Sequence, residues 1–141
     1  MSSLTRKWRW IVVASLLLGW ASWAAPARAH VGAPYPVLLE ETVGSYIASA
    51  LADPDVGQGT FYILITLPQN EAVPPGTAVT VFVEPEDGHL AEAGYPAERQ
   101  ETRYGERYVA EVAFDAQGPW AVRLVIDGPA GQGQVAFPIQ V

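Results

Sequence analysis

The chain has no cysteine, and its single methionine is the first residue. The missing thiol excludes disulfides, thiolate-bound zinc, iron–sulfur clusters and blue-copper centres. Met1 would leave with an N-terminal leader, so a thioether site for Cu(I) is excluded as well. A domain without such cross-links must be held together by its hydrophobic core alone. Val, Ile, Leu, Phe and Tyr are frequent enough after residue 37 to build that core.

Basic residues are scarce beyond the first thirty positions. Only four arginines follow residue 29, against fifteen carboxylates, which gives residues 30–141 a net charge of −11 with histidine neutral. Nucleic-acid binding depends on cationic contacts with phosphate, and anionic membranes attract basic segments. We therefore expect no nucleic-acid partner and no attraction to a membrane surface. The simplest explanation of the acidity is that a large net charge keeps the protein soluble.

Catalytic signatures are also missing. The chain contains neither G-x-S-x-G nor H-E-x-x-H, and it has only two histidines with which to build a hydrolytic triad. We expect a non-enzymatic protein. A copper-dependent enzyme that uses a terminal histidine is the third alternative, behind the two binding functions described below.

The first thirty residues have the order of an export signal. Arg6, Lys7 and Arg9 precede an uncharged apolar segment at 10–25, and the small-x-small sequence Ala27-Arg28-Ala29 follows it. We predict a signal helix within a cleaved signal peptide at 1–29 and a periplasmic or secreted location. The alternative is an uncleaved membrane anchor, although the apolar segment is shorter than the roughly 20 residues of a spanning helix. In either case the remainder faces an extracytoplasmic space.

The rest of the chain shows no sustained helical period. Short apolar runs alternate with Gly, Pro and Asp, which predicts an all-β, immunoglobulin-like or cupredoxin-like antiparallel β-sandwich of about seven or eight strands. The sandwich is expected to occupy 37–141, after an extended arm at 30–36 that contains two prolines. The expected strands are 37–43, 45–51, 60–67, 78–83, 98–103, 108–114, 120–127 and 135–141.

Three features predict where particular strands lie. The run 60–67 is apolar on both faces, which is typical of a central strand. The polar run 98–103 and the last strand, which contains Pro138, are expected at sheet edges. Trp120 begins an inward-facing row and is the only tryptophan after the leader, so we expect it to fill the core.

The two histidines after the signal core carry the metal hypothesis. Cleavage after Ala29 would make His30 the first residue, and an N-terminal histidine can chelate a metal through its amine and Nδ1. His89 lies two residues after Asp87 in a polar loop. Three nitrogens and one carboxylate oxygen suit Cu(II) best among first-row ions. The alternative to a metal site is that His89 belongs to an ordinary polar turn and that His30 is simply the residue that follows the cut.

An exported, cysteine-free sandwich with a terminal His after A-x-A and a later Asp-x-His resembles the copper-binding CopC proteins. The resemblance implies that His30, Asp87 and His89 would bind Cu(II). It departs from the family in placement, because the family's Asp-x-His lies close to the C-terminal strand and several strands follow it here. The segment from Asp115 to the end is similar to YtkA-like and FixH-like exported domains, which implies a link to copper or oxidase assembly.

Two functions therefore remain open from the sequence. The first is an exported accessory domain that binds another extracytoplasmic protein through a sheet face or a loop end. The alternative is a Cu(II)-binding or copper-delivery protein that uses His30, Asp87 and His89.

Overall fold

The protein was analysed as a computed structural model that describes residues 32–141. This part contains nine β-strands and one short 3-10 helix, and none of its helices is long and apolar enough to cross a membrane. The elements in chain order are β1 (Tyr35–Val43), β2 (Tyr46–Asp53), β3 (Gly59–Thr66), η1 (Pro68–Asn70), β4 (Ala78–Pro85), β5 (Ala93–Pro96), β6 (Glu98–Thr102), β7 (Gly105–Val112), β8 (Pro119–Gly128) and β9 (Gly131–Gln140).

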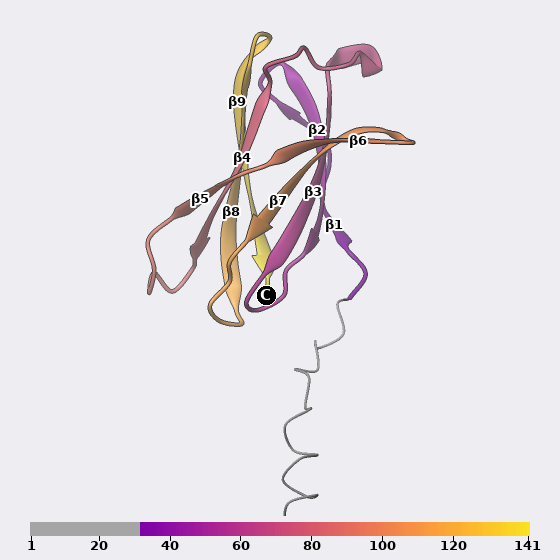
Figure 1. Ribbon diagram of the computed structural model, residues 1–141. Coiled ribbons are helices and arrows are strands. Elements are labelled where there is room, and N and C mark those ends of the chain that lie inside the picture. Colours follow the sequence, from indigo (N-terminus) through magenta and orange to yellow (C-terminus); the bar gives the residue numbers. More distant parts are fainter. Residues whose placement is uncertain (1–31) are drawn as a thin grey trace, which may run out of the picture. The chain divides into compact units, whose positions relative to one another are not determined.

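The strands form two antiparallel sheets (Figure 1). One sheet has the order β1-β2-β3-β7-β6, and the other has the order β5-β4-β8-β9. Buried side chains alternate along β2, β3, β4 and β8, which is the pattern of two sheets that share one core. The predicted all-β antiparallel sandwich is confirmed.

All eight expected strands are present, although several ends are shifted. The largest shift is in β9, which begins at Gly131 rather than at Val135 because residues 131–134 continue the hairpin with β8. A ninth strand, β5, was missed. It has only four residues and contains Gly94 and Pro96, both of which are rare inside strands.

Strand β5 exists because the chain crosses between the two sheets at Ala97. β5 pairs with β4 in one sheet, and β6 pairs with β7 in the other. Figure 1 shows the two strands as one continuous ribbon across that side of the sandwich. The Ala97 amide donates a hydrogen bond to the Val79 carbonyl at 2.8 Å, so even the crossing point stays tied to β4.

The predicted positions of the strands within their sheets agree with the structure. β3 lies in the middle of its sheet, and β6 and β9 are edge strands. The outward side of β3 is nevertheless not covered by the described chain, since Leu64 is 48% exposed. In β9 only Ile139 is fully buried, and Val135 and Phe137 are half-buried because an edge strand has a neighbour on one side only.

Trp120 fills the core as predicted. Its side chain is 3% exposed, its ring meets the Phe114 ring edge-on at 5.0 Å between centroids, and its Nε1–H donates to the Ala116 carbonyl at 3.2 Å. Burial of the ring and satisfaction of its only polar atom therefore occur together, which is how tryptophan is accommodated in a core.

Replacing this ring should be among the most destabilising single changes. We expect Trp120→Ala to lower the free energy of unfolding by about 3–5 kcal/mol, because the substitution leaves a large cavity between the sheets. Tyr104→Ala is the matched control, since Tyr104 is 83% exposed, and it should change stability by less than about 0.5 kcal/mol. Denaturant unfolding followed by circular dichroism measures both; equal losses would contradict the assigned core.

Candidate functional site

The predicted Asp-x-His pair lies in the loop after β4, and the start of this loop is well anchored. The Glu86 amide donates to the Pro119 carbonyl at 3.1 Å, which ties the loop to β8. Gly88 has a φ of 70° and its amide donates to the Pro85 carbonyl at 2.9 Å. A left-handed residue at this point closes a tight turn and is best supplied by glycine. The turn places His89 beside the loop that precedes β8.

The imidazole of His89 lies between two carboxylates. Its Nδ1 contacts Oδ1 of Asp87, and the same oxygen accepts the His89 backbone N–H at 3.1 Å. Its Nε2 lies 2.9 Å and 3.1 Å from the two carboxylate oxygens of Asp115, which comes from the loop between β7 and β8. The side chain is only 37% exposed, against 70% for Asp87 and 48% for Asp115.

The cluster contacts the hydrophobic core through the ring of His89. The His89 ring meets the Trp120 ring edge-on, with 6.2 Å between centroids. Phe114, the residue before Asp115, is buried against the same indole and its carbonyl accepts the Gly57 amide at 2.7 Å. Asp115 therefore directly follows a residue that is anchored in the core, although the three residues of the cluster lie in loops at the end of the sandwich.

The two carboxylates raise the pKa of His89 above its ordinary 6.5. The hydrogen bond to Asp87 is the larger cause and the hydrogen bond to Asp115 is the second. The same contact lowers the pKa of Asp87 below 3.8. Because the folded pKa of His89 lies above the unfolded one, its stabilisation is fully present below pH 6.5 and is lost as the pH rises through the folded pKa. The contribution of Asp87 is lost at the acidic end, as the pH falls through its lowered pKa.

Asp115 is a contact that the sequence did not reveal. It lies 26 residues after His89, between the expected strands 108–114 and 120–127. The residues meet because β4 pairs with β8, with Pro85 opposite Trp120. The loop after β4 and the loop before β8 therefore lie at the same end of the sandwich. The only sequence signal was an aspartate in the connection that leads to the Trp120 strand, four residues before β8 begins at Pro119.

The cluster alone is an incomplete donor set for a metal. Within residues 32–141, no group of three or more His, Asp or Glu side chains is arranged to hold one ion. Asp87 contacts one ring nitrogen of His89 and Asp115 contacts the other. A metal ion that replaced the proton on one ring nitrogen could therefore bind the carboxylate on that side only, and not both carboxylates. The third predicted ligand, His30, lies outside the described residues.

The first strand begins at the same end of the sandwich as the His89 loop. Tyr35 opens β1, and its hydroxyl lies 3.3 Å from the Gln140 carbonyl at the end of β9. Gln140 pairs with Pro119, which starts β8 beside the end of β4. Tyr35, the first residue of β1, therefore lies at the end of the sandwich that carries Asp87, His89 and Asp115.

No family model matches the chain, and no curated protein matches it by sequence. Solved structures match its fold. The copper-reconstituted P19 protein of Campylobacter jejuni is 12% identical with a TM-score of 0.61, over 77% of this chain and 96% of that one. A copper-bound variant of FetP from uropathogenic Escherichia coli is 14% identical with a TM-score of 0.59, over 77% and 97%. A DUF4426 family protein from Pseudomonas aeruginosa is 12% identical with a TM-score of 0.55, over 72% and 94%.

The chain has the fold of these proteins. Two of the three were solved with copper. The likeness, at such low identity, concerns the arrangement of strands and does not transfer any ligand residue to this chain.

The effect of Asp87 and Asp115 on the pKa of His89 can be measured directly. We expect His89 to titrate above pH 6.5, and both Asp87→Asn and Asp115→Asn to lower its pKa, with the larger drop for Asp87→Asn. The measurement is the pH dependence of the imidazole carbon-bound proton resonances by NMR, with His89→Ala used to assign them. A pKa that neither substitution changes would contradict the contacts described here.

Proposed function

We propose that this chain is an exported, non-enzymatic domain that binds Cu(II) at the His89 end of its sandwich. The observation that carries the proposal is the position of His89, which is held by fixed backbone between Asp87 and Asp115 at a partly exposed end of the fold. Imidazole and carboxylate are both ligands that suit Cu(II). The copper-containing P19 and FetP structures, which share the fold, support the choice of copper.

The remaining ligands in this proposal come from His30. After cleavage behind Ala29, the free amine and imidazole of His30 supply two nitrogens, and His89 supplies a third. β1 begins at Tyr35 at the His89 end of the sandwich, five residues after His30 in the sequence, which supports this pairing. Bound copper must replace the proton on one ring nitrogen of His89, and one of the two carboxylates then becomes the oxygen ligand.

Binding of another extracytoplasmic protein is the second candidate. The observation that favours it is the uncovered outer side of the β1-β2-β3 region, where Leu64 is 48% exposed at the centre of the five-stranded sheet. The half-buried side chains of Ile47, Leu51 and Tyr62 point to the same side as Leu64, and such a contiguous apolar face can serve as an interaction surface.

Copper titration of single-site variants tests the first proposal. We expect His89→Ala and His30→Ala each to weaken Cu(II) binding at least tenfold, because each removes a nitrogen ligand, and Asp127→Asn to leave it unchanged. Asp127 is an exposed carboxylate near the end of β8, far along that strand from Trp120, and serves as the matched control for the loss of one negative charge. The affinity should also increase as the pH rises through the raised pKa of His89, since copper and the proton compete for the same nitrogen.

These titrations use the exported protein and glycine as a competing Cu(II) chelator. Unchanged affinity in both histidine variants would overturn the copper site and leave the protein-binding function. An affinity that falls with rising pH would show that His89 is not a ligand.

The leader hypothesis has its own measurement. We expect the intact mass of the exported protein to correspond to a chain that begins at His30, because Ala27-Arg28-Ala29 is a small-x-small cleavage site. A mass that corresponds to any later first residue would remove the N-terminal chelate, and a mass that retains residues 1–29 would support the uncleaved anchor instead.

A further inference from the structure

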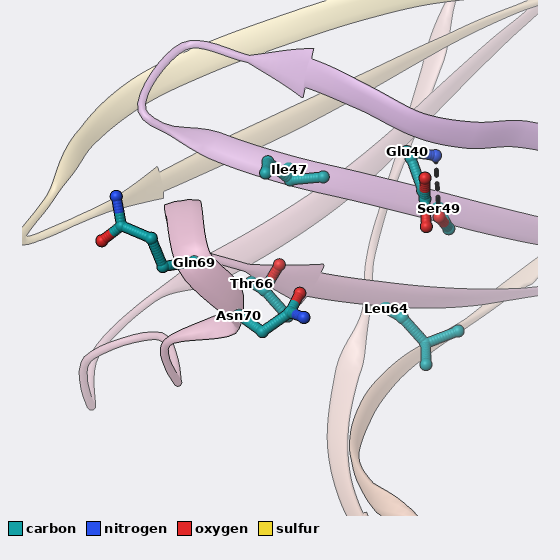
Figure 2. A pocket seen from close by; sticks show the side chains of 7 residues that line it. All are labelled: Glu40, Ile47, Ser49, Leu64, Thr66, Gln69 and Asn70. Atoms are coloured by element: carbon teal, nitrogen blue, oxygen red, sulfur yellow. Dashed lines mark hydrogen bonds between the residues drawn. The ribbon is translucent and has the colours of Figure 1, made fainter.

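A groove lies on the outer side of the five-stranded sheet, away from the His89 cluster. It has a volume of about 520 Å³ and is floored by β2 and β3 (Figure 2). The 3-10 turn at Pro68–Asn70 forms one wall, so the groove lies toward the end of β3 that is opposite to Gly59 and the His89 loop. Its lining residues are Glu40, Ile47, Ser49, Leu64, Thr66, Gln69 and Asn70.

Glu40 reaches this groove because of a β-bulge in β1. Between Leu38 and Glu41 the register shifts, so that three steps along β1 match two steps along β2. Without the extra residue, Glu40 would follow Leu38 onto the buried face, since side chains alternate along a strand. With it, the Glu40 amide donates to the Ser49 hydroxyl at 2.9 Å, drawn in Figure 2, and the carboxylate stays exposed. Bulges are known to redirect side chains at binding sites in this way.

Backbone strain in the described chain converges on the same groove. Three non-glycine residues in residues 32–141 have positive φ angles, namely Glu40 at 49°, Gln69 at 64° and Asn70 at 61°. All three line the groove. Such conformations cost on the order of 1 kcal/mol or more each, and residues that keep them gather at ligand sites. The strained residues Glu40, Gln69 and Asn70 surround a floor of two aliphatic and two hydroxyl side chains, which belong to Ile47, Leu64, Ser49 and Thr66.

The side chains that line the groove indicate which kind of ligand it can bind. Among the described residues that line the groove, none is basic, so a phosphate or carboxylate has no partner there. None is aromatic, so a sugar ring has no stacking surface. One carboxylate is too few for a divalent metal, which takes several oxygen ligands. Glu40 beside Ile47 and Leu64 instead matches an organic cation with an aliphatic stem, and the surrounding charge of −11 attracts cations.

We propose that this groove binds a primary alkylammonium group, as in the side chain of lysine. The methylene stem lies along Leu64 and Ile47, and the ammonium group pairs with Glu40. An ammonium group has three N–H donors, and the hydroxyls of Ser49 and Thr66 can accept those that Glu40 does not. The carboxamide of Asn70, which also lines the groove, can hydrogen-bond a peptide group next to a lysine, whereas the side chain of Gln69 points away from the groove in Figure 2. The inference extends the second function above and does not depend on copper.

The test measures binding of small probes by changes in the amide resonances of the ¹⁵N-labelled protein. The probe is N-acetyl-lysine methylamide, and N-acetyl-norleucine methylamide is the control, because it keeps the aliphatic stem and lacks the ammonium group. We expect the lysine probe to shift amides of Ser49, Leu64 and Asn70 and the norleucine probe to bind at least tenfold more weakly. The affinity should fall as NaCl rises, since an exposed ion pair is screened.

The variants separate Glu40 from the general acidity of the domain. Glu40→Gln removes the carboxylate and should weaken the lysine probe at least tenfold. Glu41→Gln removes the next carboxylate of the same strand, which lines a different cavity between β1 and β9, and should change the affinity by less than twofold. Both side chains are exposed, and an unchanged melting temperature shows that each variant is folded.

The outcomes decide the proposal and the source of the cation. Equal binding of the lysine and norleucine probes, or equal effects of the two glutamate variants, would overturn it. Binding of n-butylamine as tight as that of the lysine probe would support a free amine as the ligand. Weaker binding of n-butylamine would support a lysine presented by a protein. Copper titration of Glu40→Gln should match the unmodified protein, so failure here is separable from failure of the copper site.

Discussion

The pairing of β4 with β8 is the constraint on which most of this structure depends. It places Pro85 opposite Trp120, and this single register brings the loop after β4 beside the loop before β8. The same pairing directs Trp120 into the core, where its ring supports His89 from one side and Phe114 from the other. Core packing and the polar cluster at the end of the sandwich are therefore consequences of one ladder of hydrogen bonds.

The two candidate sites make different use of the same scaffold. The His89 cluster lies where loops of both sheets meet, and it contains one imidazole with a raised pKa between two carboxylates, so a protonated ring offsets only one of the two negative charges. The groove on the outer sheet face holds the carboxylate of Glu40, which forms no ion pair with another of residues 32–141. A metal at the first site must compete with a proton, whereas a cation at the second has no built-in competitor. The fold can thus hold two functions that operate independently.

The predicted and observed folds agree where local pattern dominates. Strict alternation along β8 was enough to identify the buried face that begins at Trp120, because that face of the strand packs in the core. β5 escaped detection, since a four-residue strand with Gly94 and Pro96 has no pattern of its own and exists only because the chain crosses beside β4. The bulge at Glu40 escaped for a similar reason, as it depends on Ser49 in the neighbouring strand.

The amino-acid sequence by itself determined the sandwich class, the strand order along the chain, the acidity and the pairing of Asp87 with His89, because these depend on neighbours within a few residues. Only the tertiary structure decided that Asp115 closes the other side of the His89 ring, and that Glu40 turns outward above Leu64. Both depend on register between strands that are distant in sequence. Register is set by the packing of the whole core, which no local pattern contains.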